Sequence, residues 1–226
     1  MSLVDLAAAL DRSAQALGVV LTEAQHTQLL DYLALLAKWN KVYNLTAVRD
    51  PAEMLTHHLL DSLAVIAPLR RQMGEGAFSL LDVGSGGGLP GVIVAICCPD
   101  VQVTCVDAVA KKAAFVQQVA VSLGLRNLTG LHARVESVQQ SFDVVASRAF
   151  ASLADFTRWS ASALAPHSVW MAMKGKHPDD ELAALPPAVE VFHVEQLQVP
   201  GLDAERCLLW LRPVRTDHLV QKAAWK

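Results

Sequence analysis

No hydrophobic stretch of the sequence is long enough to cross a membrane, because charged or helix-breaking residues interrupt each one. The first residues also lack the basic segment with which a secretory signal peptide begins. The chain has 226 residues, of which 53% are hydrophobic and 18% charged, and this is enough to bury a sizeable core. We therefore expect a globular, cytoplasmic protein without a membrane-spanning segment.

Motifs for disulfides and metal ions are missing as well. The four cysteines show neither a C-x-x-C nor a Cys/His spacing, and three of them fall in apolar segments that indicate strands or buried helices. His57, His58 and Asp61 share one helical segment, but two core histidines explain this spacing better than a metal site does. We expect reduced thiols and no bound metal.

Positive charge is not in surplus, since the formal net charge is −3 at pH 7. Such a balance argues against a protein that coats nucleic acid without specificity. It leaves room for one local basic patch. Any RNA partner would therefore be bound through a small surface.

Helical periodicity fills the first third of the chain. A capping box that begins at Thr22 and an N-cap at Asp50 mark the starts of two helices, and a leucine- and alanine-rich segment forms an earlier one. The expected helices cover residues 2–17, 23–44 and 51–67. We expect a helical appendage over residues 1–72.

The periodicity changes after a glycine-containing linker, and short apolar segments typical of buried strands then alternate with helical segments. Strands are expected at 78–83, 101–106, 128–132, 142–146 and 168–173, with helices at 90–98, 110–123 and 152–164. This alternation predicts an α/β fold, with a doubly wound, mostly parallel sheet over residues 73–214. The segments 190–199 and 207–211 resemble a closing antiparallel hairpin, and 215–226 a polar tail.

The most informative stretch is DVGSGGGLPG at residues 82–91, which directly follows the first expected strand. Its glycines allow a sharp turn and a close approach to a ligand that any Cβ would exclude. Pro90 suits the first turn of a helix, whose free N–H groups would face that ligand. The pattern predicts a strand, a nucleotide-binding turn and a helix start.

Two cofactors are compatible with this turn. Gly86, Gly88 and Gly91 match G-x-G-x-x-G, and Asp107 follows about 20 residues on, so the match would predict an NAD-dependent oxidoreductase. Counted from the strand end, the acid-x-Gly-x-Gly that begins at Asp82 resembles the first motif of S-adenosylmethionine (SAM) methyltransferases. An acid at this place suits a cationic, amino-acid-bearing cofactor better than a pyrophosphate. We favour SAM.

Charged residues follow the second strand as well. Asp107 stands at its end, where a carboxylate would accept hydrogen bonds from ribose hydroxyls or would cap the next helix. Lys111 and Lys112 lie in the first turn of that helix, where the helix dipole disfavours cations. They are either solvated surface lysines or residues that attract RNA phosphate.

The later strands end in similar segments. Residues 134–136 follow the third strand, where this fold commonly contacts the base of a nucleotide. Arg148 and Phe150 follow the fourth strand, and a guanidinium with an aromatic ring is a natural pair for stacking and phosphate binding. Lys174 ends the fifth strand, but no P-loop spacing surrounds it.

Several catalytic groups are absent from these strand ends. No Asn/Asp-Pro-Pro-aromatic tetrapeptide and no cysteine nucleophile follow the fourth strand, and no paired His/Glu base stands out. A methyl acceptor with a free lone pair, which needs no deprotonation, would fit such a site.

Five motifs taken together resemble the RsmG family, also called glucose-inhibited division protein B. They are WNKVYNLTAVR at 39–49, HLLDSL at 58–63, DVGSGGGLPG at 82–91, SRAF at 147–150 and KG at 174–175. The resemblance covers about residues 20 to 213. It implies a class I, Rossmann-like SAM-dependent methyltransferase that methylates N7 of one guanine in a loop of small-subunit (16S) ribosomal RNA.

The resemblance, together with the motifs, also assigns residues to roles. Cofactor contacts are expected at Asp82, Gly84, Gly86, Gly88, Leu89, Asp107, Val135, Glu136 and Arg148. Arg148 would position the reactants without a general base, and Lys111, Arg134 and Lys174 would contact RNA. The partner would be small-subunit ribosomal RNA or the assembling small subunit, bound by a monomer without metal. An NAD-dependent oxidoreductase and a SAM-binding module without activity remain as alternatives.

Overall fold

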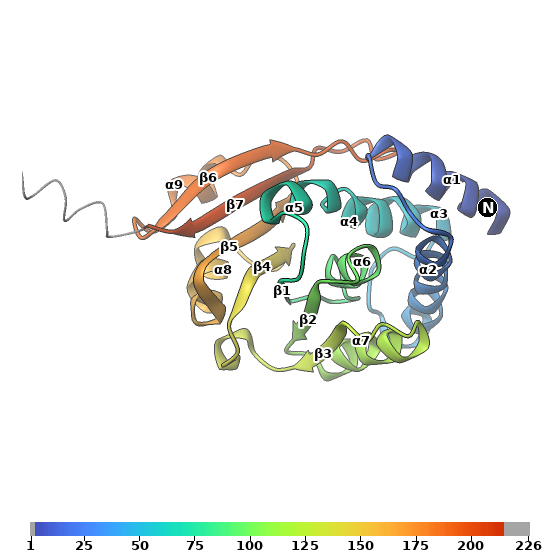
Figure 1. Cartoon of the computed structure of the whole chain (residues 1–226), viewed down its shortest axis with the longest axis horizontal. Helices are drawn as coiled ribbons and strands as arrows, with labels where there is room; N and C mark the ends of the chain where they lie inside the picture. The colour runs from blue at the N-terminus through green and yellow to red at the C-terminus, as the bar shows by residue number, and fades with distance from the viewer. Residues whose placement is uncertain (1–2, 215–226) are drawn as a thin grey trace, which may run out of the picture.

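The computed structural model describes residues 3–214, and within this range the strands form one seven-stranded sheet (Figure 1). The strands are β1 (Ser79–Val83), β2 (Gln102–Asp107), β3 (Leu128–His132), β4 (Phe142–Arg148), β5 (Leu164–Lys174), β6 (Val189–Gln196) and β7 (Cys207–Pro213). Their order across the sheet is β3-β2-β1-β4-β5-β7-β6. Strands β1 to β5 pair in parallel, whereas β7 is antiparallel to both β5 and β6. The predicted mostly parallel sheet with a C-terminal antiparallel hairpin is confirmed.

The strand order reverses at β1. This strand pairs with β2 on one side and with β4 on the other, so that Asp82 lies beside both Cys105 and Ala146. In open α/β sheets such a reversal leaves a crevice at the carboxyl ends of the strands, where ligands bind. The glycine-rich turn after β1 and Arg148 at the end of β4 both line a cavity at this place.

Alternating side chains along the strands divide the core into two layers. Leu80 and Val144 belong to one buried cluster, and their chain neighbours Leu81 and Val145 belong to the other. The elements between the strands are α6 (Gly91–Cys97), α7 (Ala110–Ser122), the 3₁₀ turns η2 (Val135–Ser137) and η3 (Ala161–Ala163), α8 (Leu153–Ser160) and α9 (Asp179–Ala183). Helices α6 and α7 contribute to the first cluster and α8 to the second. The sequence does not predict α9, because five residues are too few to show a helical period.

The N-terminal part is helical, as predicted. It consists of α1 (Leu3–Ala16), α2 (Glu23–Tyr43), α3 (Pro51–Met54), the π-helical turn η1 (Leu55–Leu60), α4 (Asp61–Leu63) and α5 (Ile66–Met73). The capping box at Thr22 is present, since the Thr22 hydroxyl accepts from the Gln25 amide at 3.2 Å and the Gln25 side-chain oxygen accepts from the Thr22 amide at 2.9 Å. Asp50 caps α3 through the amides of Ala52 and Glu53.

The prediction of one continuous α-helix over residues 51–67 is wrong. The π-helical turn interrupts it, and α4 and α5 are separate. No glycine or proline lies within residues 52–67 to signal a break. The π-helical turn is contacted from β4, because Arg148 donates a hydrogen bond to the backbone carbonyl of His57 in this turn.

The N-terminal helices share their hydrophobic core with the sheet. One cluster of buried side chains extends from Leu29 and Leu36 of α2 to Leu89, Ile93 and Phe115 beside the sheet. The division of the chain predicted at 72/73 falls before Met73, the last residue of α5, and the buried core continues across it. The predicted polar tail at 215–226 lies outside the described residues.

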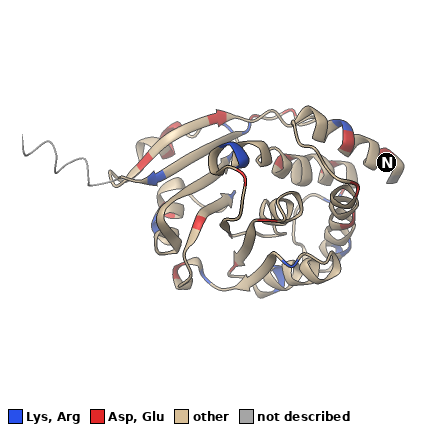
Figure 2. Cartoon of the chain, viewed as in Figure 1, with Lys and Arg blue, Asp and Glu red and all other residues tan. Residues whose placement is uncertain are grey.

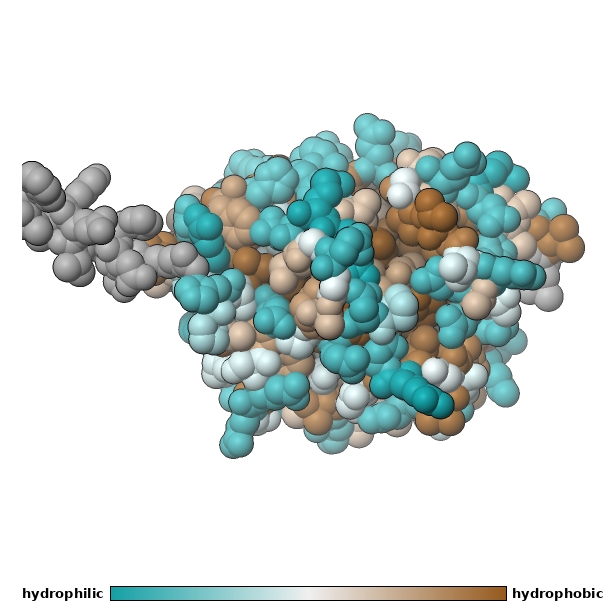
Figure 3. Space-filling model, in the orientation of Figure 1, coloured by the Kyte–Doolittle hydropathy of each residue, from teal (hydrophilic) through white to brown (hydrophobic). Residues whose placement is uncertain are grey.

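The outer surface carries charges of both signs. Lys and Arg are interspersed with Asp and Glu along the elements (Figure 2), and the face in Figure 3 is largely hydrophilic with smaller hydrophobic areas between. No helix within residues 3–214 is long and apolar enough to span a bilayer. The same range contains no group of three potential metal ligands. All the cysteines, which are Cys97, Cys98, Cys105 and Cys207, are free.

Candidate active site

The turn after β1 is built on glycines with positive φ. Gly84, Gly86 and Gly88 have φ angles of 65°, 59° and 85°, a region that residues with a Cβ rarely adopt. A Cβ on Gly86 would meet no protein atom within 4 Å, so this position faces open space. A Cβ on Gly88 would lie 2.5 Å from Val92, so Gly88 faces the interior of the protein. Of these two predicted cofactor contacts, Gly86 is open to a ligand and Gly88 is not.

Asp82 supports this turn from behind. Its Oδ2 accepts a hydrogen bond of 2.8 Å from the amide of Gly91, at the start of α6, and its side chain is completely buried. Burial raises the pKa of this carboxyl to about 7. Asp82 Oδ1 and the neighbouring Ser85 Oγ are buried and have no hydrogen-bond partner among the described residues. Two polar atoms therefore lack a partner directly beside the turn.

Two cavities at the carboxyl ends of the strands have Gly84 and Ala149 in common. One has a volume of about 510 Å³ and also contains Thr46, His57, Asp61, Leu89, Arg148, Lys174 and Arg206. The other has a volume of about 380 Å³ and also contains Asp107, Lys112, Arg134, Val135, Glu136 and Phe150. Both volumes lie in the range of small-molecule sites. A third cavity, of about 1150 Å³, lies away from these strand ends, around His167, Phe192 and Arg212. Below, the smaller and the larger cavity are the two that meet at Gly84.

Phe150 covers Gly84 where the two cavities meet. A Cβ on Gly84 would lie only 2.2 Å from the Phe150 ring, so the aromatic ring rests directly on the glycine backbone. Ala149, which precedes it, has a φ of 53°. The segment after β4 thus packs over the turn after β1.

Asp107 lies in the smaller cavity and already has two backbone partners. Its Oδ2 accepts from the amide of Gly86 at 3.0 Å, and its Oδ1 accepts from the amide of Val109 at 2.8 Å. The nitrogen of Lys112 is 3.8 Å from Oδ2. Asp107 therefore joins the glycine turn to the start of α7. Each carboxylate oxygen has a second lone pair, so a ribose hydroxyl can still be bound.

Arg148 lies in the larger cavity and is bound from the N-terminal helices. Its Nη1 donates to Asp61 Oδ2 at 2.9 Å and to the carbonyl of His57 at 3.0 Å. Arg206, from the loop before β7, donates from Nε to Asp61 Oδ1 at 2.7 Å. Sequence reasoning missed Asp61 and Arg206 as site residues. The HLLDSL motif contains Asp61, but no local signal identifies Arg206.

The two histidines of the π-helical turn differ in exposure. His58 is buried, as predicted, whereas the prediction of a core position for His57 is wrong because His57 is exposed. His58 Nε2 lies 2.6 Å from the hydroxyl of Thr46. Burial, with a contribution from Arg148, lowers the pKa of His58 to about 4. His58 is therefore neutral at pH 7.

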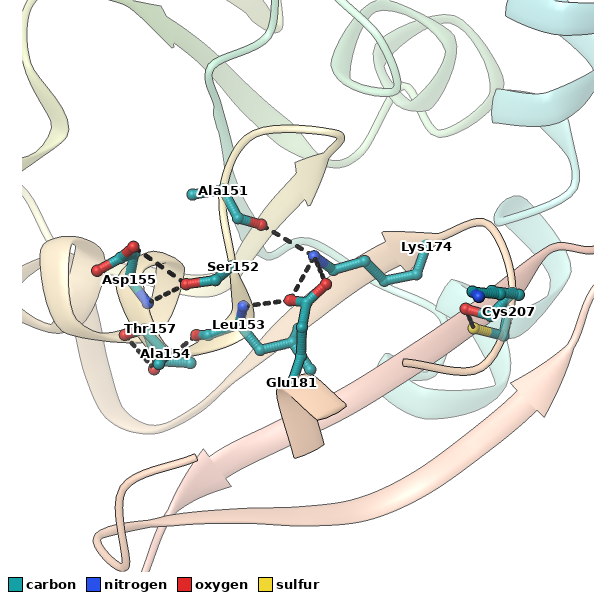
Figure 4. A network of polar contacts seen from close by, with 10 residues as sticks. Ala151, Ser152, Leu153, Ala154, Asp155, Thr157, Lys174, Glu181 and Cys207 are labelled. Atoms are coloured by element: carbon teal, nitrogen blue, oxygen red, sulfur yellow. Dashed lines mark hydrogen bonds and ion pairs between the residues drawn. The ribbon is translucent and has the colours of Figure 1, made fainter. Parts of the chain in front are cut away.

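Lys174 is held in a network that joins β5 to α9 (Figure 4). Its Nζ donates to both carboxylate oxygens of Glu181, at 2.8 and 3.0 Å, and to the carbonyl of Ala151 at 2.9 Å. Glu181 also accepts from the amide of Leu153 at 2.6 Å, at the start of α8. Lys174 thus fixes the segment after Arg148, and Glu181 offsets its charge.

The predicted RNA-binding residues occupy different places. Arg134 lines the smaller cavity, Lys174 lines the larger one, and Lys111 is exposed on the first turn of α7 without lining either cavity. Val135 and Glu136 lie with Asp107 in the smaller cavity, as expected for residues around one nucleoside. Their contacts with ligands remain predictions.

The strand order, the glycine turn after β1 and the acid at the end of β2 define a class I SAM-dependent methyltransferase. Solved structures with this fold include N-methyltransferase NodS from Bradyrhizobium japonicum in complex with S-adenosyl-L-homocysteine (TM-score 0.56, 14% identity, 79% of this chain and 100% of that chain). TrmN from Thermus thermophilus also has it (TM-score 0.56, 19% identity, 68% of this chain and 49% of that chain). At these identities the likeness shows the fold, and it confirms the predicted fold class.

Sequence comparison identifies the family. The family model described as GidB, rRNA small subunit methyltransferase G, matches residues 25–209, and the chain belongs to this family. Relatives called ribosomal RNA small subunit methyltransferase G include those of Acidovorax ebreus (71% identity over 214 residues, 91% of this chain and 95% of the relative) and Methylibium petroleiphilum (63% over 207 residues, 91% and 94%). The predicted resemblance is confirmed. The alternative of an NAD-dependent oxidoreductase is not supported.

Proposed function

We propose that the protein transfers the methyl group of SAM to N7 of one guanine in a loop of small-subunit (16S) ribosomal RNA. One observation carries this proposal: two cavities meet at Gly84, at the place where the strand order reverses. The smaller cavity contains Asp107, Val135 and Glu136, which suit a nucleoside. The larger contains Arg148. We assign to it the methyl-bearing end of the cofactor and the acceptor base. The choice of small-subunit ribosomal RNA as the substrate rests on the names of the relatives.

The residues around the turn fit a cofactor of this kind. Gly86 has no Cβ, and no protein atom lies within 4 Å of the place where one would be, so a ligand can approach its backbone. Buried polar atoms are rarely without a partner. Ser85 lines the larger cavity, so a ligand there would satisfy its Oγ, whereas an ordered water would satisfy the buried Asp82 Oδ1. The residues that would hold SAM directly are Gly84, Gly86, Leu89, Asp107, Val135, Glu136 and Arg148. Asp82 and Gly88 would shape the turn from inside the protein.

The reaction needs alignment more than proton transfer. SAM supplies the methyl group as an electrophile on a sulfonium, and guanine N7 has an in-plane lone pair that is free to attack it. His58 is a weak base, because its pKa is lowered to about 4, and its Nε2 is engaged by the Thr46 hydroxyl, which agrees with a site that uses no general base. Alignment of two reactants is worth up to about 7–11 kcal/mol in ideal cases. Arg148, held by Asp61 and the His57 carbonyl, is placed to supply it.

The RNA has to present the target base outside a regular duplex. N7 faces the deep, narrow major groove of A-form RNA, which side chains cannot reach, so the guanine lies in a loop or is flipped out. Lys111, Arg134 and Lys174 are proposed contacts for its phosphates. We further propose that the protein acts in the cytoplasm as a monomer, without metal, on small-subunit ribosomal RNA or on the assembling subunit.

Mapping of N7-methylguanine in ribosomal RNA tests this function. We expect one small-subunit guanine to lose its methyl group in cells without the gene and to regain it with the wild-type gene but not with a Gly86→Val variant. Calorimetry should show binding of SAM and none of NAD. A protein that binds SAM while the RNA of both cell lines is modified identically would be a SAM-binding module without activity.

A further inference from the structure

One buried carboxylate joins two arginines at the wall of the larger cavity. Asp61 Oδ2 accepts from Arg148 Nη1 at 2.9 Å, and Asp61 Oδ1 accepts from Arg206 Nε at 2.7 Å. The Asp61 side chain is only 4% exposed, whereas the side chains of Arg148 and Arg206 are 19% and 22% exposed. Asp61 therefore lies behind two guanidinium groups that reach the cavity.

The three residues come from distant parts of the chain. Asp61 is 87 residues from Arg148 and 145 residues from Arg206. The π-helical turn before Asp61 presents the carbonyl of His57 to the same Arg148 nitrogen at 3.0 Å, so both hydrogens of Nη1 have acceptors. Single π-helical turns occur frequently at functional sites. The turn and Asp61 together fix the plane of the Arg148 guanidinium.

Hydrogen-bond donors remain on both arginines. Each guanidinium carries five N–H groups. Within residues 3–214, Nε and Nη2 of Arg148 and Nη2 of Arg206 have no acceptor, because the Arg148 bonds all start from Nη1 and Arg206 uses Nε and Nη1. Two positive groups share one carboxylate, which leaves a surplus of one positive charge at the wall. Planar, charged donors in such a place suit the oxygens of a phosphate group.

We propose that Asp61 is a positioning residue for methyl transfer. It holds Arg148, which also lies beside the cofactor, and Arg206 as a fixed pair against a phosphate of the RNA next to the target base. This inference rests on the proposed function. Without Asp61, the two guanidinium groups repel each other and gain rotamer freedom, so the same charges are less well placed. An ion pair that only stabilises the fold predicts a different result: its loss lowers stability and leaves the folded enzyme fully active.

The first test is Asp61→Asn, which keeps the size of the side chain and removes its charge. The rate constant kcat/KM for RNA is measured at saturating SAM, at a temperature where circular dichroism shows the native fold. We expect it to fall about 10- to 100-fold, the range for a lost positioning contact. Glu190→Gln is the matched control, because it breaks an exposed carboxylate pair with Arg212 Nε at 2.8 Å on β6 and β7 and should leave kcat/KM unchanged. A wild-type value for Asp61→Asn overturns the inference.

A double-mutant cycle with Arg206→Gln separates positioning from fold stability. If Asp61 acts through Arg206, Asp61→Asn causes a much smaller loss in the Arg206→Gln background than in the wild type. Fully additive losses overturn the inference. Should Asp61→Asn not fold, Arg206→Lys decides: it keeps the charge but loses the fixed fork, so kcat/KM should fall as far as in Arg206→Gln, and near-wild-type activity overturns the inference. Failure of the wild type itself to methylate RNA is a separate result, which refutes the proposed function.

Discussion

The phenolic hydroxyl of Tyr32, in the middle of α2, donates a hydrogen bond of 2.7 Å to the carbonyl of Gly87 in the glycine-rich turn. Tyr32 is completely buried, and burial raises its pKa far above the usual value, so the hydroxyl stays protonated and remains a donor. Leu36, one turn further along α2, also packs against Gly87. Helix α2, which lies outside the sheet, thus supports the proposed cofactor turn through the contacts of Tyr32 and Leu36 with Gly87.

Tyr32→Phe should weaken both the fold and SAM binding. The change leaves the Gly87 carbonyl without its donor, and an unsatisfied buried acceptor costs about 1–3 kcal/mol. We expect a lower midpoint of thermal unfolding and a severalfold weaker SAM affinity by calorimetry. Tyr43→Phe, which removes a hydroxyl from the exposed end of the same helix, is the control and should change neither. Equal effects of the two variants would remove the proposed role of Tyr32.

Asp107→Ala should weaken SAM binding by about ten- to a hundredfold, because a carboxylate that accepts from ribose hydroxyls contributes about 1.5–3 kcal/mol. Asp107 also accepts from the amides of Gly86 and Val109, so some stability should be lost as well. Asp107→Asn keeps the shape of the side chain and should lose less. Calorimetry at a temperature where both variants are folded measures the difference. An unchanged SAM affinity would exclude the ribose contact.

Gly86→Val should abolish cofactor binding while the protein still folds. The Cβ of residue 86 meets no protein atom within 4 Å, so the valine would occupy the space proposed for the ligand. Its φ of 59° adds backbone strain. Gly124→Val is a matched control, with a φ of 66° and no atom within 4 Å of its Cβ, at the end of α7 and outside both cavities. We expect similar destabilisation of the two variants and loss of SAM binding in Gly86→Val alone.

Asp82 should make the fold less stable as the pH rises. Its folded-state pKa is raised from 3.8 to about 7, so the folded protein holds a proton that the unfolded chain releases. Stability therefore falls by about 1.4 kcal/mol for each pH unit between these two values. Asp82→Asn is neutral at every pH and should lack this contribution. Urea unfolding of both proteins from pH 4 to 8 measures it, and a constant difference between them would refute the raised pKa.

Alanine at Lys111 or Arg134 should each reduce the slope of log RNA affinity against log salt by about 0.7–0.9, the value for one phosphate contact. SAM affinity should stay nearly intact. Lys174→Ala should lower the slope and also destabilise the protein, because Lys174 binds Glu181 and Ala151. Glu181→Gln should have the opposite effect on RNA binding. It removes the negative charge that offsets Lys174, so RNA should bind more tightly. Wild-type slopes for the three alanine variants would show that the phosphates bind elsewhere.

Local signals explain what the sequence predicts correctly. The capping box at Thr22, the N-cap at Asp50 and the glycine turn act within a few residues, so their structures are visible in short segments. Alternating strands and helices then restrict the topology to a parallel sheet, and this places the strand ends at one edge. The positions of Asp107, Arg148 and Lys174 at that edge follow.

Long-range pairing explains what the sequence does not reveal. The sequence predicts the position of Arg148 at the end of the fourth strand, but its acceptors, Asp61 and the His57 carbonyl, lie 87 and 91 residues away. No glycine or proline signals the π-helical turn, whose His57 carbonyl accepts from Arg148. The sequence does not show that the charge of Lys174 is paired. Its partner Glu181 lies in the short helix α9, which the sequence does not predict.

The outer edge of the sheet formed by β6 has a consequence for the behaviour of the protein in concentrated solution. An edge strand exposes unpaired backbone groups to which a strand of another molecule can add, and charged side chains and bulges hinder such addition. Strand β6 carries Glu190 and Glu195, and its pairing with β7 shifts register between Val191 and His193. Both features make this edge a poor template for intermolecular strand pairing, and they reduce the tendency of the protein to aggregate through β6.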